Sequence, residues 1–472
     1  MLLGLDLGTG SLKALLLEEG AVVAEASEPY PVTSSRPGWA ETQPEAWWQA
    51  AVAAVDRLEP RHKRGVRAVG LSGQMHSVVL CRKGGAPLRP AILWADTRSA
   101  AQLEPYRQLS ESERRRLANP ITTGMTGPSL LWLRDHEPTS YETASWALQA
   151  KDWLRLRLTG EVSAEPSDAS ATLLYDLEQD TWAQDVLHAL GLRPDLLAPL
   201  TGSGQVVGTL RAQAANALGL LPGTPVVAGG GDAACSALGS GLVRTGQVQA
   251  NIGTGMQIFA VRAEPTADPH LRTHLYRTVS GGYYAVAAMQ NAGLALEWVR
   301  GLFGLSWDEM YAEAFAVEPG CEGLSFLPYL TGERTPHLDP GARGAWHGLS
   351  LRHGRGHLVR SALEGVAFAL KDGLMALRDA GVDLQRLRLS GGGTLRAEWR
   401  QLLANVLEQP LYTVSAPSAS ARGAALLAGA ALGDWRLDDD LFPTSSLSAE
   451  PEDPGALGAA YERFRARYIS ST

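Results

Sequence analysis

An acidic residue followed by a glycine-rich turn lies near the start of the chain, at residues 6–10 (DLGTG). Glycines let backbone N–H groups approach an anion closely, and neighbouring hydroxyls add donors, so the turn is suited to phosphate. A buried carboxylate such as Asp6 is costly unless it is paired, and hydrated Mg²⁺ bound to phosphate is a suitable partner. Lys13 either neutralises the same phosphates or lies in solvent. Taken alone, a hairpin turn without a ligand is the commoner use of such a sequence.

The same pattern recurs about half the chain later, at residues 251–255 (NIGTG). Two glycine hairpins that face each other across a cleft can hold one polyphosphate, so the duplication favours phosphate binding. Neither segment is a GxxxxGK[ST] P-loop, and no GxGxxG follows a first strand. A third glycine run, residues 391–393, leads from a predicted strand into a helix over 395–407. It either suits close approach of a flat ligand such as adenine or forms a tight turn.

Three consecutive glycines precede Asp232, between a predicted buried strand at 225–228 and a predicted helix at 233–239. The sequence therefore places Asp232 at a helix N-terminus. Asp is a frequent N-cap there, a role worth roughly 1 kcal/mol. The same position is the carboxyl end of a strand, where open α/β sheets bind ligands, and there Asp232 would act as a general base. The two roles are compatible.

Polar side chains also follow a predicted strand that ends in Leu-Ser-Gly, as Gln74, Met75 and His76. An amide and an imidazole at the carboxyl end of a strand could bind a small polyol, while a histidine satisfied in a loop is the plainer interpretation. Trp94 and Asp96, with an arginine two positions further on, form either a structural ion pair or a wall of the substrate site.

Cysteine and histidine spacing gives little support to a metal cage. The three cysteines are unclustered and lack CxxC spacing, which excludes a disulfide scaffold and a thiolate zinc site and favours a reducing cytosol. Histidines lie four residues apart at 270 and 274 and again at 353 and 357. Without a helical context or a neighbouring acid, these pairs do not indicate a metal.

The elements that position these residues follow from the apolar pattern. Residues 2–7, 11–17 and 21–27 predict three strands of an antiparallel meander. Residues 42–45 have the Thr-x-x-Glu form of a capping box before a helix. In each half, a long helix leads into a strand that ends in Leu-Ser-Gly, and the second of these helices is expected over 357–380. Two similar halves are the simplest account, and they predict domains at 1–243 and 244–472.

Composition restricts the function further. The chain has 472 residues, 45% hydrophobic and 19% charged, which is ordinary for a globular protein of two or three domains. A formal net charge of −8 at pH 7 disfavours a nucleic-acid or anionic-membrane partner. No stretch gathers the roughly 20 apolar residues of a membrane span, and the N-terminus lacks the basic start of a signal peptide. A cytoplasmic location is expected.

Taken together, these segments resemble the FGGY carbohydrate kinases, and within that family the xylulose kinases most closely. The resemblance covers nearly the whole chain and includes the segments GLDLGT (4–9), PGWAE (37–41), GQMH (73–76), RPAILWAD (89–96), KDWL (151–154), LPYLTGERTP (327–336) and ALEG (362–365). Three positions depart from the usual family pattern. Ser77 stands where Gly is usual, and Ala95 and Ala233 stand where Asn is common, so the departures bear on the choice of sugar rather than on the reaction class.

The resemblance implies an α/β fold of the actin/hexokinase (ribonuclease H-like) type, with two lobes and an active site in the cleft between them. It implies ATP and Mg²⁺ as cofactors, a homodimer as an allowed but undetermined assembly, and Asp232 and Asp6 as catalytic residues, with Asp6 holding the metal through water. The residues implied for the ketose are Gln74, Met75, His76, Trp94, Asp96 and Asp232. Those implied for ATP are Gly8, Thr9, Gly10, Ser11, Lys13, Gly253, Thr254, Gly255, Gly391, Gly392 and Gly393.

The expected reaction is transfer of the γ-phosphoryl group of ATP to the terminal hydroxyl of a ketose, most closely D-xylulose to D-xylulose 5-phosphate. Another ketose or a polyol is the alternative within the family. An ATP-driven conformational switch or a sugar sensor of the same fold is the alternative from another class, because fold alone does not decide function. Gln74, Met75, His76 and Asp232 are the residues that favour the kinase.

Overall fold

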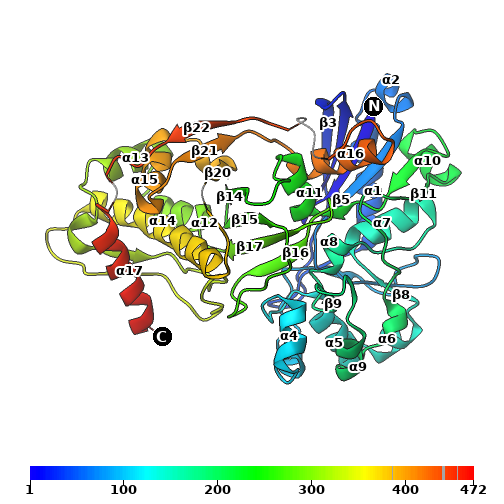
Figure 1. Ribbon diagram of the computed structural model, residues 1–472, viewed down its shortest axis with the longest axis horizontal. Coiled ribbons are helices and arrows are strands. Elements are labelled where there is room, and N and C mark those ends of the chain that lie inside the picture. The colour runs from blue at the N-terminus through cyan, green and yellow to red at the C-terminus, as the bar shows by residue number, and fades with distance from the viewer. Residues whose placement is uncertain (385, 438–441, 454, 472) are drawn as a thin grey trace.

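Two seven-stranded sheets form the framework of the described residues, which are 1–384, 386–437, 442–453 and 455–471 of the computed structural model. In Figure 1 the N-terminal part of the chain, blue through cyan to the green of α10 and β11, builds one lobe, and the parts from light green through yellow to red build most of the other. The duplicated two-lobed α/β fold predicted from the sequence is confirmed. None of the described helices is long and apolar enough to cross a membrane.

The first sheet has the strand order β11-β12-β5-β1-β2-β3, with β13 paired to β5. The predicted meander is confirmed, because β1, β2 and β3 pair antiparallel in sequence order. The strands are β1 (Leu2–Leu7), β2 (Ser11–Glu18), β3 (Ala21–Pro29), β5 (Ala68–Gly73), β11 (Val206–Thr209), β12 (Pro225–Val227) and β13 (Gly230–Gly231).

The second sheet repeats this plan, in the order β16-β17-β15-β14-β20-β21-β22. In both sheets the first strand of the glycine hairpin pairs antiparallel with the second and parallel with the Leu-Ser-Gly strand: β1 with β2 and β5, and β14 with β15 and β20. The strands are β14 (Val248–Ile252), β15 (Met256–Arg262), β16 (His274–Arg277), β17 (Tyr283–Met289), β20 (Leu387–Ser390), β21 (Leu411–Val414) and β22 (Ser445–Ala449).

Helices cover both sheets, and four two-stranded ribbons complete the described elements. The helices before the second hairpin are α1 (Pro44–Asp56), α2 (Pro60–Arg64), η1 (Ala100–Gln102), α3 (Leu103–Arg107), α4 (Glu111–Leu117), α5 (Thr126–His136), α6 (Pro138–Thr143), α7 (Ala150–Thr159), α8 (Pro166–Ala169), α9 (Gln184–Ala189), η2 (Pro194–Leu196), α10 (Ala212–Leu218) and α11 (Asp232–Gly239). Those after it are α12 (Gly293–Leu302), α13 (Trp307–Phe315), η3 (Cys321–Gly323), α14 (Arg355–Asp379), η4 (Gly392–Thr394), α15 (Ala397–Leu407), α16 (Ala419–Ala431) and α17 (Gly458–Ser471). The ribbons are β4 (Glu41–Thr42) with β7 (Ala91–Ile92), β6 (Val79–Cys81) with β8 (Trp146–Leu148), β9 (Tyr175–Asp176) with β10 (Thr181–Trp182), and β18 (Ser325–Leu327) with β19 (Ala345–His347).

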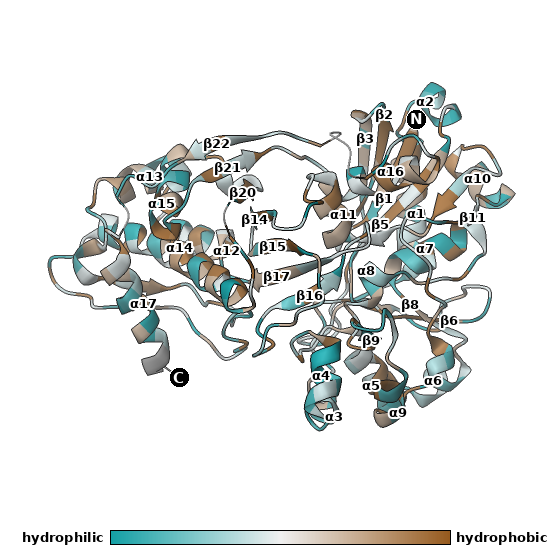
Figure 2. Cartoon of the chain, viewed as in Figure 1, coloured by the Kyte–Doolittle hydropathy of each residue, from teal (hydrophilic) through white to brown (hydrophobic). Residues whose placement is uncertain are grey.

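Helix α16 comes from the second half of the chain but lies on the first sheet, beside β5 in Figure 1. Figure 2 shows why it is buried: α16 is mostly apolar, whereas the exposed helix α4 is mostly hydrophilic. Its backbone contacts β1 at Gly4 and β5 at Gly70, where any β-carbon would overlap carbonyl groups of α16. The predicted boundary at 243/244 lies between α11 and β14 and stays a prediction.

Helices α11 and α16 also pack against each other between the lobes. A β-carbon at Gly423 of α16 would overlap the carbonyl oxygen of Cys235 of α11, so the two backbones are in direct contact. Apolar side chains of β15, β16 and β17 of the second sheet, among them Phe259 and Val286, close the same cluster. The two lobes therefore share a close-packed core.

Two local predictions were wrong. Thr42 does not cap a helix, because it lies in β4 and its hydroxyl donates to the carbonyl of Pro31 (3.1 Å). Helix α1 begins instead at Pro44, whose fixed φ suits the first helical position. Asp232 is not an N-cap either: Gly231 holds that position, and Asp232 is the first residue of α11.

Replacing Gly423 by Ala should therefore destabilise the protein, because the new methyl group overlaps the backbone of α11. We expect a loss of about 1–3 kcal/mol in the free energy of unfolding, measured by urea denaturation. Gly301→Ala is the matched control, since Gly301 also lies in a helix but has open space around its Cα. It should gain up to about 1 kcal/mol from helix propensity. Equal stability of the two variants would contradict the close packing of α11 and α16.

Candidate active site

A cavity of about 200 Å³ lies between the lobes at the carboxyl ends of the central strands. Both lobes contribute to it: Asp232 comes from α11, and Gln257 comes from β15 of the second sheet. Its remaining lining residues are Thr9, Met75, His76, Trp94, Ala233, Phe259, His274, Tyr276, Val286, Ala288 and Arg334. Polar groups line walls that are otherwise apolar, as in sites for small molecules. We call this the inner cavity.

A second cavity, of about 460 Å³, adjoins the inner cavity and contains the second glycine hairpin. Trp94, Gln257, Ala288 and Arg334 line both of them. Asn251, Gly253, Thr254 and Gly255 bring the backbone of the hairpin to its wall. We call this the middle cavity. Its position beside the inner cavity and its glycine backbone suit a phosphate chain.

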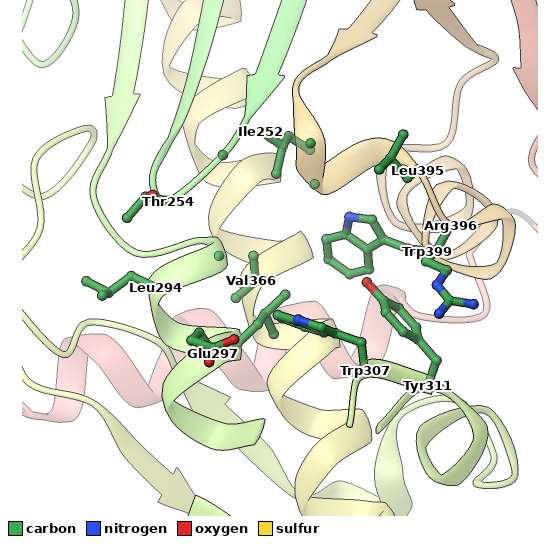
Figure 3. Close-up of a pocket in the computed structure, with 15 residues that line it drawn as sticks. Ile252, Thr254, Leu294, Glu297, Trp307, Tyr311, Val366, Leu395, Arg396 and Trp399 are labelled. Atoms are coloured by element: carbon green, nitrogen blue, oxygen red, sulfur yellow. The ribbon is translucent and has the colours of Figure 1, made fainter. Parts of the chain in front are cut away.

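A third cavity, of about 640 Å³, continues from the middle cavity and shares Gly253, Thr254 and Leu294 with it. Figure 3 shows that the rings of Trp307, Tyr311 and Trp399 surround its hollow, opposite the hairpin residues Ile252 and Thr254. Gly392 and Gly393 form part of its wall. Flat apolar rings beside bare backbone suit an aromatic base. The three cavities thus form one track from the outer surface to Asp232.

Asp232 and Asp6 influence each other electrostatically in this cleft. Burial raises the pKa of Asp232 to about 7, and the negative charge of Asp6 adds to the rise. The backbone N–H of Ala233 donates to the Asp232 carboxylate (2.8 Å) and opposes it. A carboxyl with a pKa near neutrality is suited to general base catalysis at physiological pH.

Asp6 lies in β1, where neighbouring strands hold it in place. Ser72 of β5 donates a hydrogen bond to its carboxylate (2.9 Å), and Lys13 of β2 is its partner in the antiparallel register. Burial raises the pKa of Asp6, while the Ser72 hydrogen bond and the charge of Lys13 work in the opposite direction. The Lys13 ammonium in turn donates to the hydroxyl of Ser418 (2.9 Å), next to α16.

Two histidines of the inner cavity are neutral and have defined tautomers. Burial lowers the pKa of His76 to about 4, and it lowers that of His274 as well. Nδ1 of His76 faces the carbonyl of Ala171 (2.6 Å), which can only accept, so Nδ1 carries the proton. Nδ1 of His274 faces Oδ1 of Asn119 (3.1 Å) and is protonated for the same reason. Each Nε2 is therefore a hydrogen-bond acceptor, suited to a hydroxyl.

The structure brings together most of the residues that the sequence singled out. Thr9, Met75, His76, Trp94 and Asp232 line the inner cavity. The indole N–H of Trp94 donates to the Thr9 hydroxyl (2.8 Å), which leaves the hydroxyl proton of Thr9 able to donate elsewhere. Gly253, Thr254 and Gly255 line the middle cavity, and Gly392 and Gly393 the outer one.

Two residues predicted to bind the ketose do not line the inner cavity. Asp96 is buried in an ion pair with Arg98 (2.7 Å) and accepts from the backbone N–H of Ala40 (2.7 Å), so it has the structural role that the sequence left open. Gln74 lies behind the first hairpin, where its amide donates to the carbonyl of Gly8 (3.4 Å).

The remaining ATP-binding predictions fall beside the track rather than in its walls. Gly8, Gly10, Ser11 and Lys13 belong to the first hairpin, which presents Thr9 to the inner cavity. Gly391, with a positive φ of 95°, packs closely on the carbonyl of Ile252 and supports the turn of Gly392.

Sequence reasoning missed several side chains that line the track. Gln257, His274, Tyr276 and Arg334 face the inner cavity, and Trp307, Tyr311 and Trp399 face the outer one. His274 was weighed only as half of a metal pair. The described residues contain no group of three or more His, Cys, Asp or Glu able to hold a metal ion.

The fold and the cleft define a two-lobed phosphotransferase of the actin/hexokinase type. Family models for the FGGY family of carbohydrate kinases match residues 1–239 (N-terminal domain) and 248–432 (C-terminal domain). The chain is 36% identical to a xylulose kinase of Escherichia coli (strain K12), over 99% of this chain and 98% of that protein. It is 37% identical to a xylulose kinase of Klebsiella pneumoniae, over 92% of this chain and 90% of the relative. A solved xylulose kinase from Rhodospirillum rubrum has a TM-score of 0.91, 32% identity and coverage of 99% and 98% of the two chains.

The chain therefore belongs to the FGGY family of carbohydrate kinases. It is a phosphotransferase with an alcohol group as acceptor, and ATP is its phosphoryl donor.

Replacing Trp307 by Ala should weaken ATP binding, because an aromatic wall of the outer cavity is lost. Stacking on a base contributes about 1–3 kcal/mol, so we expect KM for ATP to rise roughly tenfold while KM for the sugar stays unchanged. Trp298→Ala is the matched control, since Trp298 is similarly exposed but does not line the cavity. A normal KM for ATP in Trp307→Ala would place the base elsewhere.

The pH dependence of catalysis should follow Asp232. A general base works only when deprotonated, so kcat/KM for the sugar should fall about tenfold per pH unit below pH 7 and level off above it. His76, with a pKa of about 4, stays neutral over this range and adds no second step. ADP binding measured by calorimetry at each pH is the control for folding. A rate that stays constant down to pH 5 would contradict the raised pKa.

Proposed function

We propose that this protein is an ATP-dependent kinase that converts D-xylulose to D-xylulose 5-phosphate. The observation that carries the proposal is the position of Asp232: it is a carboxyl with a pKa of about 7 in a small polar cavity that opens onto the phosphate-binding hairpin. The relatives named above, at 36% and 37% identity, are xylulose kinases, which favours that sugar over other ketoses.

Acceptors in the inner cavity would orient the ketose. The unprotonated Nε2 atoms of His76 and His274 would accept from sugar hydroxyls, and the amide of Gln257 can both donate and accept. Met75 and Phe259 supply apolar walls against the carbon chain. Held in this way, the terminal hydroxyl would lie beside the Asp232 carboxylate.

Asp232 would take the hydroxyl proton as the sugar oxygen attacks the γ-phosphorus of ATP. The bond from the sugar oxygen to phosphorus forms, the bond from phosphorus to the β,γ-bridging oxygen breaks, and ADP leaves. Positioning and charge neutralisation dominate such a transfer, so the chain needs no covalent intermediate. Movement of the lobes around the bound sugar would exclude water and prevent wasteful hydrolysis of ATP.

The residues around Asp6 fit a hydrated Mg²⁺. The carboxylate receives a neutral hydrogen bond from Ser72, and it lies beside a second carboxylate whose charge a cation would offset. Mg²⁺ keeps several water ligands and binds through one or two carboxylates and the substrate phosphates, which agrees with a site that lacks a protein cage. When bound, the ion would neutralise charge on the ATP phosphates, and Asp6 would hold it through water.

We also propose that the protein is located in the cytoplasm. Its three cysteines are free and buried, as suits a reducing compartment. Sugar and ATP are its expected partners, and a homodimer stays compatible with the chain without being indicated by it.

An ATP-coupled assay against pentuloses, hexuloses, polyols and sugar acids tests the function. We expect D-xylulose to give the highest kcat/KM and ADP release to depend on added sugar. Asp232→Ala should keep its affinity for ADP but lose about 10² or more in kcat, a usual general-base contribution. Asp195→Ala, at an exposed aspartate that lines none of the three cavities, is the control and should behave like the parent protein. ADP release that does not depend on any of the added sugars would contradict the kinase function. Full turnover by Asp232→Ala would show that Asp232 is not the general base.

A further inference from the structure

We propose that Arg334 binds the phosphoryl group during its transfer and stabilises the negative charge that develops there. This inference rests on the proposed kinase function and adds a catalytic residue to it. Arg334 lies in the loop between β18 and β19, on the opposite side of the cleft from Asp6 and Asp232. It would supply a cation from the second lobe in the walls of the inner and middle cavities, which Lys13 of the first lobe does not line.

Position is the first argument. Arg334 lines both the inner cavity, where the sugar hydroxyl would lie, and the middle cavity, where the second hairpin would hold phosphate. A group being transferred must pass the boundary between these two cavities. Arg334, Trp94, Gln257 and Ala288 form that boundary, and of these four only Arg334 is charged.

Charge is the second argument. Among the described residues that line the inner and middle cavities, Arg334 is the single Lys or Arg. The two histidines there are neutral, because burial lowers their pKa values. Asp232 brings a carboxyl, and Asp6 lies close enough to raise its pKa. An arriving phosphoryl group would therefore find Arg334 as the one cationic side chain of these walls.

The third argument is that the guanidinium lacks a polar partner. No described residue forms a hydrogen bond or an ion pair with the Arg334 side chain, and its guanidinium lies over the ring of Trp94, 5.4 Å from the centroid. Burial lowers its pKa, which reflects the cost of holding the charge there. A cation–π contact is worth about 0.5–2 kcal/mol and leaves the five N–H donors unused. Bidentate binding of phosphate oxygens would use them.

The neighbouring acid, Glu333, attracts the guanidinium electrostatically but forms no ion pair or hydrogen bond with it. The Glu333 carboxylate accepts from the backbone N–H groups of Gln290 (2.7 Å) and Arg334 (2.7 Å) and from the amide of Asn291 (3.1 Å). These bonds fix the loop to the end of β17. Thr335 adds to the anchoring, because its hydroxyl donates to the carbonyl of Arg272 (2.8 Å) and its backbone pairs with Ala288. The loop thus presents the guanidinium in a defined place while leaving it unpaired.

The fourth argument is the negative charge that develops on the phosphoryl group during its transfer. As the sugar oxygen attacks and the bridging oxygen departs, negative charge is spread over the three other oxygens of the γ-phosphoryl group. A guanidinium fixed at that point binds the transition state more tightly than the ground state. Only such differential binding raises kcat. Lys13 belongs to β2 of the first sheet and Arg334 to the loop between β18 and β19, so the two cations would approach the phosphates from different lobes.

The test compares Arg334→Ala and Arg334→Lys with the parent protein in sugar-dependent ADP release. We expect Arg334→Ala to lose about 10²–10³ in kcat, the usual effect of removing one donor to a developing anion, with KM for the ketose changed less than about threefold. Arg334→Lys should recover part of the loss, and added guanidinium chloride should raise the rate of Arg334→Ala but not that of Asp232→Ala. Arg352→Ala, at an exposed arginine, is the control and should be unaffected.

A binding measurement makes the role independent of turnover. ADP with aluminium fluoride and ketose mimics the transferring phosphoryl group, and the parent protein should bind ADP more tightly with fluoride than without. Arg334→Ala should keep its affinity for ADP alone but lose the tighter binding that aluminium fluoride confers. Normal kcat in Arg334→Ala would overturn the proposal. Loss of activity only with sugar acids would also overturn it, because it would show that the guanidinium binds a carboxylate of the acceptor. Parent protein that phosphorylates no sugar would refute the kinase itself, and this inference with it.

Discussion

Burial of two carboxylates, Asp6 and Asp232, in one cleft is the constraint on which the rest of the active site depends. Removing a carboxylate from water is costly, and placing a second one nearby adds repulsion. The chain offsets this cost unequally. Asp6 accepts a hydrogen bond from Ser72 and lies near the positive charge of Lys13. Asp232 instead has backbone N–H groups at the start of a helix, and its pKa is about 7. A site that tolerates such an acid is poised for proton transfer rather than for stability.

The duplication shows how this constraint shaped the second half of the chain. Asp6 pairs in register with Lys13 and Ser72, and at the corresponding points of the second sheet Asn251 pairs with Gln257 and Ser390. The geometry is the same, but the charged pair has become two amides. A third carboxylate facing the same phosphates would repel them and would compete with them for Arg334, which lines the same cavity as Asn251. The second hairpin can therefore bind phosphate through its backbone, while the charged side chains Asp6 and Lys13 belong to the first hairpin.

Local patterns predicted much of this architecture. The glycine hairpins, the meander and the repeat were visible because turns and strands depend on near neighbours, and the expected helix at 357–380 is α14 almost to the residue. What the sequence could not give were contacts between distant segments. His274 reaches the inner cavity from a strand with no motif, Arg334 reaches it from the family segment 327–336, in which sequence reasoning assigned it no role, and α16 crosses to the first sheet. The Trp-x-Asp-x-Arg spacing allowed both an ion pair and a place in the sugar site for Asp96, and only the fold shows the buried pair with Arg98.

The crossing of α16 explains how the two carboxylates are held in a fixed relation to each other. One face of α16 lies on β1, which carries Asp6, and another packs on α11, which begins at Asp232. Ser420 of α16 also donates to the backbone carbonyl of Asp232 (3.2 Å). Asp6 and Asp232 therefore belong to one close-packed unit, whereas Gln257 and the loop of Arg334 belong to the second sheet and its connections. Close packing of backbone on backbone holds the carboxylate pair in place, and Phe259 and Val286 of the second sheet pack against the same cluster.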